Sequence, residues 1–254
     1  MFKHSWEMKI SGYGSANRPC GDYHDMKRFV AFAFVAAVFF AWGVSTIRYQ
    51  VFPFDLLKAT ARATALSPGS GTPSSNAREM FSLTTRDADV VFVGDSITRD
   101  GPWQDVFQNV AVANRGVGGE TTLDISKRLD TITSTKAERA LIMAGINDLY
   151  AGRSPEQIAE TYFGIIKSLR ASGMEVIVQS TITCTGACRY QREITVLNDL
   201  LREYADRNGL RFIDLNGSMA DGGQLKGAYT SDGVHIAPKG YQQWISELRP
   251  VLGR

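Results

Sequence analysis

A serine, a histidine and an aspartate in this chain have the types and spacing needed for nucleophilic catalysis. Ser96 follows the apolar run at 90–93 and a single glycine and aspartate, and Asp232 stands three residues before His235. Serine is a weak nucleophile unless a base removes its proton, and histidine is most effective as that base when a carboxylate fixes its tautomer. These residues therefore predict acyl chemistry through a serine nucleophile.

Each of these residues also has an ordinary structural explanation. A serine at a strand-to-helix turn is more often a helix cap than a nucleophile, and an Asp-x-x-His pair is common in surface loops. However, His235 is the only histidine after residue 24, so it is the one imidazole available to the later part of the chain. The same scarcity argues against a histidine-rich metal site.

Two further segments contain glycine and asparagine where a developing negative charge would need hydrogen-bond donors. Residues 114–121 follow the predicted strand at 110–113, and residues 145–148 follow the predicted strand at 140–144. Glycine lets the backbone approach a ligand closely, and an asparagine side chain supplies a neutral donor. Glycine and asparagine also form ordinary turns, but four such segments in this order argue against turns alone.

Together these segments resemble the SGNH (GDSL-type) hydrolase superfamily, which is named for a Ser, Gly, Asn and His in four blocks. The second block is similar to the form found in platelet-activating-factor acetylhydrolase-like and lysophospholipase-like members. The resemblance covers roughly residues 86–254, and no block departs from the pattern. The blocks are Gly94-Asp95-Ser96, Asn114-x-Gly116-x-Gly118-Gly119-Glu120-Thr121, Gly145-x-Asn147-Asp148 and Asp232-x-x-His235.

The resemblance implies a role for each of five residues. Ser96 is the nucleophile, His235 the base and Asp232 the carboxylate that orients the base. The backbone N–H groups of Ser96 and Gly119 and the side-chain amide of Asn147 form the oxyanion hole. The implied activity is serine ester hydrolysis with no metal ion and no organic cofactor.

These residues predict the reaction more closely than they predict the substrate. We expect an acetyl or short-chain acyl ester of envelope carbohydrate or lipid. An acyltransferase that moves acetyl groups on envelope polysaccharide would use the same residues, whereas the intact blocks argue against a catalytically inactive binding domain. Trp103, Tyr150 and Tyr229 are close to the blocks in sequence, and each either lines a substrate pocket or packs in the core.

Strand and helix patterns alternate along the later part of the chain. This alternation indicates a parallel sheet with helices on both faces, which is also the three-layer α/β/α sandwich that the resemblance implies. The predicted strands cover 90–93, 110–113, 140–144, 176–180 and 210–214, and the predicted helices cover 122–129, 155–171, 191–208 and 238–252.

The amino-terminal part has a different composition. Residues 29–47 form an uncharged stretch of nineteen residues, long enough to cross a bilayer as one helix. Lys27 and Arg28 precede it, so the positive-inside tendency places the catalytic domain outside the cytoplasm. We expect an uncleaved anchor at the cell membrane, with a cleaved signal peptide and a start at Met26 as alternatives.

These features divide the chain into four parts. We expect a short disordered segment at 1–28, the transmembrane anchor at 29–47, a linker at 48–85 that is rich in small and polar residues, and the hydrolase domain at 86–254. The overall net charge of +2 is misleading, because residues 79–254 carry nineteen Lys and Arg against twenty-two Asp and Glu, a net of −3, and so show no basic excess to suggest a nucleic-acid partner. The oligomeric state is left open.

Cys184 and Cys188 fall in the loop after the fourth predicted strand. In an oxidising compartment they could pair across the three residues between them, and two unpaired buried thiols are the alternative. A zinc site is a poor explanation, because no further cysteine or histidine lies close by in the sequence.

Overall fold

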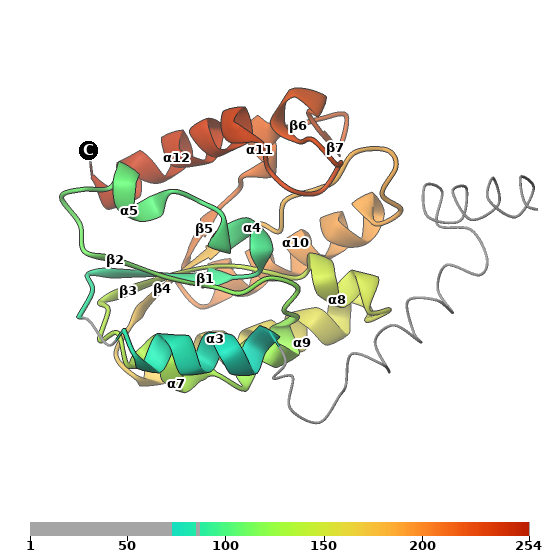
Figure 1. The fold of residues 1–254 in the computed structure, drawn as a ribbon. Helices are drawn as coiled ribbons and strands as arrows, with labels where there is room; N and C mark the ends of the chain where they lie inside the picture. Colours follow the sequence, from blue (N-terminus) through green and yellow to red (C-terminus); the bar gives the residue numbers. More distant parts are fainter. Residues whose placement is uncertain (1–72, 85–86, 254) are drawn as a thin grey trace, which may run out of the picture. The chain divides into compact units, whose positions relative to one another are not determined.

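Five strands form a parallel sheet at the centre of the fold (Figure 1). The computed structural model describes residues 73–84 and 87–253. The strand order is β2-β1-β3-β4-β5, and every neighbouring pair is parallel. The strands are β1 (Val90–Gly94), β2 (Val112–Gly116), β3 (Arg139–Met143), β4 (Glu175–Gln179) and β5 (Arg211–Ile213).

This strand order creates a switch point at the carboxyl ends of β1 and β3. The chain passes from β1 outward to β2 and then crosses to β3 on the other side of β1. The connections that follow β1 and β3 therefore diverge, and this is the position at which open α/β sheets bind ligands. Ser96 follows β1 and Asn147 follows β3, so both lie at this end of the sheet.

Helices cover both faces of the sheet (Figure 1). The α/β fold with a five-stranded parallel sheet, predicted from the alternating pattern, is confirmed. Helices α5, α11 and α12 lie on one face, and α3, α7 and α9 lie on the other. The helices are α3 (Pro73–Ser82), α4 (Ser96–Arg99), α5 (Trp103–Val106), α6 (Thr122–Ser126), α7 (Leu129–Thr133), α8 (Ile146–Tyr150), α9 (Pro155–Ala171), α10 (Gln191–Arg207), α11 (Asn216–Met219) and α12 (Pro238–Leu252).

Two smaller elements lie between α11 and α12. They are a two-stranded hairpin, β6 (Ala220–Asp221) with β7 (Gln224–Leu225), and a 3-10 helix, η1 (Gly227–Tyr229). The chain then continues through residues 230–236 to α12, and this connection carries Asp232 and His235.

An aromatic cluster attaches the helix that begins at Ser96 to the core. Trp103 stacks on Phe92 of β1 at 4.4 Å between ring centroids and meets the edge of Trp244 of α12 at 4.8 Å. Its indole N–H donates to the carbonyl of Thr98 at 2.7 Å, and the Tyr241 hydroxyl donates to the carbonyl of Ile97 at 2.7 Å. These two bonds satisfy carbonyl groups of α4 and hold it in place.

Trp103 is therefore a core residue, because only 1% of its surface is exposed. Of the two explanations that its sequence position left open, packing is the one that the structure supports. The strand β1 is buried along its whole length, as expected for a parallel strand that is covered by helices on both faces of the sheet.

The second strand differs from its predicted position. It begins at Val112 and extends to Gly116, so that Asn114 lies inside the strand and not after it. Polar residues fit here because the Asn114 amide donates to the carbonyl of Arg99 at 2.9 Å while its oxygen accepts the N–H of Gly116 at 2.9 Å. Asn114 thus joins β2 to the end of α4.

The predicted helix at 122–129 is two short helices, α6 and α7. The break falls at Lys127 and Arg128, where the α6 turn ends and a new turn begins at Leu129. Arg128 is drawn into the interior by the carboxylate of Glu120, and this tertiary contact interrupts the helix.

The carboxyl end of the predicted linker is helical. Residues 73–82 form α3, which packs near α7. The exposed pair Arg78–Asp130 joins the two helices at 2.7 Å, and the Phe81 ring lies 4.5 Å from the guanidinium carbon of Arg115. The boundary between linker and domain therefore lies nearer to residue 71 than to residue 86.

The predicted anchor at 29–47 and the segment at 1–28 lie outside the described residues. Within 73–84 and 87–253, no helix has both the length and the apolar character required to cross a membrane.

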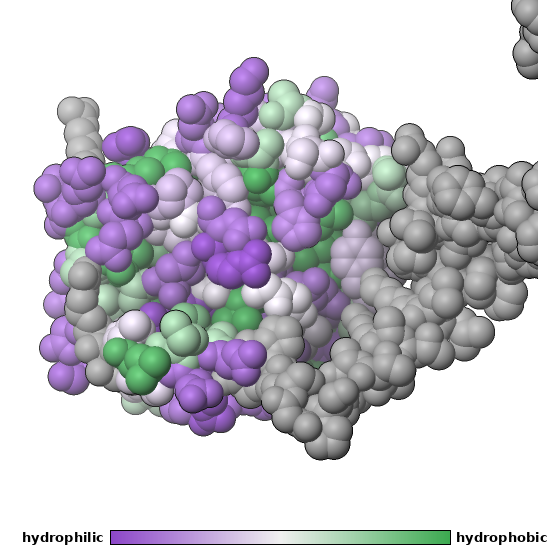
Figure 2. Space-filling model, in the orientation of Figure 1, coloured by the Kyte–Doolittle hydropathy of each residue, from purple (hydrophilic) through white to green (hydrophobic). Residues whose placement is uncertain are grey.

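The surface of the described residues is predominantly polar. On the face shown in Figure 2, hydrophilic side chains surround small hydrophobic areas. The large hydrophobic side chains that are exposed on the described part of the chain are Met80, Leu83, Leu123 and Tyr150.

Asp95 is a fully buried carboxyl group directly before Ser96. Its Oδ1 accepts the N–H of Ile97 at 3.0 Å and so caps α4. The pKa of Asp95 is raised from 3.8 to about 7, mainly by burial and in part by the Asp148 carboxylate, whereas the Ile97 N–H bond and the charge of His235 act in the opposite direction.

We predict that Asp95→Asn changes the pH dependence of stability. The pKa of Asp95 is higher in the folded chain than in the unfolded chain, so the folded state binds the extra proton between about pH 4 and pH 7 and wild-type stability falls as the pH rises through that window. Asparagine stays neutral. The free energy of unfolding of the variant relative to wild type should therefore increase from pH 4.5 to pH 8, by about 1.4 kcal/mol for each unit of pKa shift.

Urea unfolding at the two pH values measures this difference. Asp206→Asn, at an exposed position on α10, is the matched control. A stability difference between Asp95→Asn and wild type that stays constant with pH would contradict the effect of burial on Asp95.

Candidate active site

Ser96, His235 and Asp232 form one chain of hydrogen bonds. The Ser96 hydroxyl lies 3.0 Å from His235 Nε2, and His235 Nδ1 lies 2.6 Å from Asp232 Oδ2. With a proton on Nδ1, the ring donates to the carboxylate and presents Nε2 as an acceptor to the serine. The structure thus brings together three residues that the sequence placed in two distant segments.

Asp232 is held in its ionised form by donors around it. Its Oδ1 accepts the N–H groups of Val234 at 2.9 Å and His235 at 2.7 Å. Partial burial tends to raise the pKa of Asp232, but these N–H groups and the His235 ring outweigh it and hold the pKa below its usual value. The carboxylate is therefore charged at neutral pH and fixes the orientation of the imidazole.

The residues that carry the acid–base pair form a tight loop, residues 230–236, which we call the histidine loop. An antiparallel bridge joins Thr230 to Ile236 at its two ends. The N–H of Ala237 donates to the carbonyl of Tyr229 at 2.7 Å, and the Thr230 hydroxyl accepts the N–H of Gly233 at 2.9 Å. The loop closes on itself directly before α12.

Gly119 lies at a turn whose surroundings are open. Its φ is +77°, and no atom lies within 4 Å of the position that a Cβ would occupy. The next turn starts α6, where Thr121 and Asp124 form a capping box. The backbone near Gly119 is therefore fixed from its carboxyl side while its own face is unobstructed.

A buried ion pair fixes the segment that contains Gly119. Glu120 and Arg128 are each 2% exposed at the side chain, and the Arg128 Nη2 lies 2.6 Å from a Glu120 carboxylate oxygen. Arg128 also donates to the carbonyl of Arg115 at 2.8 Å. The pair thus joins the turn after β2 to the last residues of β2 itself.

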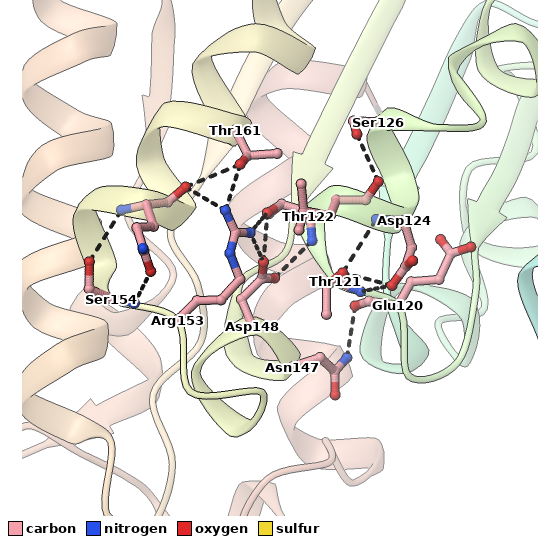
Figure 3. A network of polar contacts seen from close by, with 12 residues as sticks. Glu120, Thr121, Thr122, Asp124, Ser126, Asn147, Asp148, Arg153, Ser154 and Thr161 are labelled. Atoms are coloured by element: carbon pink, nitrogen blue, oxygen red, sulfur yellow. Dashed lines mark hydrogen bonds and ion pairs between the residues drawn. The ribbon is translucent and has the colours of Figure 1, made fainter. Parts of the chain in front are cut away.

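Asn147 lies in α8 with its amide directed at the segment that contains Gly119 (Figure 3). The amide nitrogen donates to the carbonyl of Glu120 at 3.0 Å and lies 3.5 Å from Asp95 Oδ2. Glu120 follows Gly119 in the chain, and Asp95 precedes Ser96. The structure therefore places Asn147 between the neighbours of the other two predicted oxyanion donors.

Asp148 and Arg153 hold α8 in place, and the sequence analysis assigned neither of them a role. The Asp148 carboxylate is fully buried and accepts the N–H of Thr122 at 2.8 Å, its hydroxyl at 2.7 Å and the Arg153 guanidinium (Figure 3). This network joins α8 to α6, and so Asn147 to Gly119. The one sequence signal was the acidic residue directly after Asn147.

Two tyrosines form an edge-to-face pair beside the histidine loop. Tyr150 and Tyr190 have ring centroids 5.1 Å apart at an angle of 83°. Burial raises the pKa of Tyr150, and the nearby Tyr190 hydroxyl and Asp232 carboxylate add to the increase. The Tyr150 ring therefore lies at the side of the site where Asp232 is found, with 38% of its surface exposed.

Cys184 and Cys188 form a disulfide bond in the loop after β4, with their Cα atoms 5.8 Å apart. Of the two states that the sequence left open, the structure has the paired one. Both cysteines are buried. Among the described residues, no cluster of three or more His, Cys, Asp or Glu side chains is arranged to hold a metal ion.

Comparison with known proteins identifies both curated relatives and similar folds. The N-acylneuraminate cytidylyltransferase of Streptococcus agalactiae is 26% identical over 178 residues, which is 66% of this chain but 41% of that protein. The chain thus spans about two fifths of the length of this relative.

Two solved structures have the same fold. A proposed platelet activating factor from Streptococcus pneumonia is 22% identical with a TM-score of 0.62, covering 71% of this chain and 91% of that one. A GDSL-like lipase from Bacteroides thetaiotaomicron is also 22% identical with a TM-score of 0.62, covering 70% of this chain and 96% of that one.

The family follows from a match to residues 92–243 by the model of the GDSL-like lipase/acylhydrolase family. The matched segment contains Ser96, Gly119, Asn147, Asp232 and His235, and it is more than half of the chain. The chain therefore belongs to the GDSL-like lipase/acylhydrolase family.

Proposed function

We propose that the protein hydrolyses acyl esters through a Ser96–His235–Asp232 triad. The observation that carries the proposal is the chain of hydrogen bonds from the Ser96 hydroxyl to His235 at 3.0 Å and from His235 to Asp232 at 2.6 Å. This is the arrangement by which a base removes the serine proton while a carboxylate stabilises the resulting imidazolium.

In the first half of the reaction, Ser96 Oγ attacks the ester carbonyl carbon as its proton passes to His235 Nε2. The carbonyl oxygen becomes an oxyanion, which accepts hydrogen bonds from the N–H groups of Ser96 and Gly119 and from the Asn147 amide. His235 then gives its proton to the leaving alcohol, and an acyl-enzyme is left on Ser96.

In the second half, His235 takes a proton from water, and the hydroxide attacks the acyl-enzyme. Collapse of the second tetrahedral intermediate returns the proton to Ser96 Oγ and releases the carboxylic acid. Transfer of the acyl group to a sugar acceptor would need the same residues. The family match favours hydrolysis, with water as the acceptor.

For the substrate, we propose an acetyl or short-chain acyl ester of an envelope carbohydrate or lipid. His235 must protonate the leaving alcohol, so the alcohol lies on the His235 side of Ser96. The Asp232 carboxylate acts electrostatically on Tyr150, whose ring pairs with that of Tyr190, and an aromatic ring with a hydroxyl group suits a sugar ring. The name of the curated relatives, which refers to an acylated sugar acid, supports a carbohydrate.

We also propose that the domain works outside the cytoplasm on a single-pass membrane anchor. The apolar stretch at 29–47 with Lys27 and Arg28 before it supports this orientation. The disulfide between Cys184 and Cys188 supports an oxidising compartment.

The first test of the proposed triad removes the nucleophile. Ser96→Ala should lower kcat by at least about 10⁴-fold, because a triad without its serine loses nucleophilic attack. A serine-directed phosphonate should label wild type at Ser96 and leave the variant unlabelled. The control is Ser168→Ala, an exposed serine on α9, and near-normal turnover by Ser96→Ala would disprove the assignment.

The second test separates the oxyanion hole from the triad. Asn147→Ala should lower kcat by about 10²–10³-fold with little change in KM, since the amide bond to the oxyanion is strongest in the transition state. Labelling of Ser96 should slow but persist. Steady-state kinetics on a short-chain p-nitrophenyl ester measures the split, and an increase in KM alone would show that Asn147 is not an oxyanion donor.

The third test concerns the anchor. The full-length chain should partition with membranes, whereas a chain beginning at Gly71, which retains α3, should be soluble and active. Sedimentation and detergent extraction measure the distribution. Recovery of the intact full-length chain in the soluble fraction would contradict the membrane anchor.

A further inference from the structure

The loop closed by the Cys184–Cys188 disulfide lies directly against the histidine loop. We call residues 184–188 the disulfide loop. The N–H of Thr185 donates to the carbonyl of Gly233 at 2.9 Å. Gly233 lies between Asp232 and His235 in the tight loop that carries both, so the bond reaches the backbone that sets their positions.

The side chain of Thr185 makes a second contact with the same residue. Gly233 has φ of +92°, and a Cβ built on it would lie 2.6 Å from Thr185 Oγ1. The threonine hydroxyl therefore packs into the space that a side chain at Gly233 would take. The two loops are fitted together at this point, and only glycine allows so close an approach.

The disulfide loop is itself fixed on its other sides. The Gln191 side chain of α10 donates to the carbonyl of Thr185 at 2.5 Å. The N–H of Leu225, in the β6–β7 hairpin, donates to the carbonyl of Cys184 at 3.1 Å. Because both cysteines are buried, the disulfide ties Thr185 to the interior through covalent bonds.

The histidine loop, in contrast, has little packing around Asp232 and His235. The side chains of Asp232 and His235 are 51% and 49% exposed. Burial therefore does little to hold them, and their positions depend on hydrogen bonds within the loop and on its neighbours. Thr185 supplies a neighbour that is anchored outside the loop.

We propose that the disulfide loop is a positioning element for His235, acting through Thr185 on Gly233. The proposal rests on the proposed function, because it assigns His235 as the base. A base that moves away from Ser96 Oγ loses rate steeply, since a displacement of about 1 Å can cost about 10²-fold. Activity per folded molecule then depends on the disulfide.

The first experiment breaks the disulfide in the full-length chain. Cys184→Ser with Cys188→Ser should lower kcat by about 10-fold or more while KM for a p-nitrophenyl ester changes little. Phosphonate labelling of Ser96 should slow by a similar factor. Assays run well below the Tm of the variant, on protein that circular dichroism shows to be folded, separate this effect from loss of stability.

The second experiment keeps the disulfide and tests the contact itself. Gly233→Ala introduces a methyl group 2.6 Å from Thr185 Oγ1 and should lower kcat. Thr185→Ala removes that oxygen, so the Gly233→Ala/Thr185→Ala double variant should recover several-fold of the lost kcat. Such a recovery would show that the two positions are coupled. Gly222→Ala is the matched control: its φ is +56°, nothing lies within 4 Å of its Cβ position, and kcat should stay unchanged.

The outcomes separate the positioning role of the disulfide loop from the proposed hydrolase function. Wild-type kcat in the folded Cys184→Ser/Cys188→Ser variant would overturn the positioning role. If that variant does not fold, the Gly233–Thr185 cycle decides: independent effects of the two changes would overturn the role, and coupled effects support it. Ser96→Ala is assayed beside them, and retained activity there would remove the proposed function itself.

Discussion

Much of the described structure positions the hydrogen bond between Ser96 and His235. It joins two residues 139 positions apart in the chain at 3.0 Å, and neither lies in a long element. The Ser96 side is set by β1, by the cap from Asp95 and by the bonds from Trp103 and Tyr241 to the carbonyls of α4. Tyr241 belongs to α12, which begins just after the histidine loop, so one helix contributes to both ends of the bond.

Three buried carboxyl groups surround the site, and each is accommodated differently. Glu120 pairs with Arg128, and Asp148 accepts from Arg153 and Thr122. Asp95 is satisfied by the N–H of Ile97 and lies near the Asn147 amide, and burial raises its pKa to about 7. The Glu120–Arg128 pair fixes the turn after β2, and Asp148 joins α8 to α6. Burial instead disfavours the charged form of Asp95, directly before the proposed nucleophile Ser96.

Long, strongly patterned elements could be predicted from the sequence, and tertiary contacts could not. Helices α9 and α12 have the predicted bounds, because their apolar spacing is regular and a proline marks each start. The start of β2 and the helix at 73–82 were missed, since each depends on a partner far away in the chain. The break at Arg128 was missed because it depends on an ion pair with Glu120, eight residues earlier. The four blocks led to the residues of the site, but Asp148 and Arg153 gave no local signal that they would join α8 to α6.

The order of the catalytic residues along the chain has a consequence for biosynthesis. Ser96 leaves the ribosome 139 residues before His235, and the strands β2 to β5 lie between the two in the chain. A partly synthesised chain therefore holds a serine with no base beside it. The contact between Ser96 and His235 can therefore form only after the chain has been made as far as residue 235 and the histidine loop has folded against the end of the sheet.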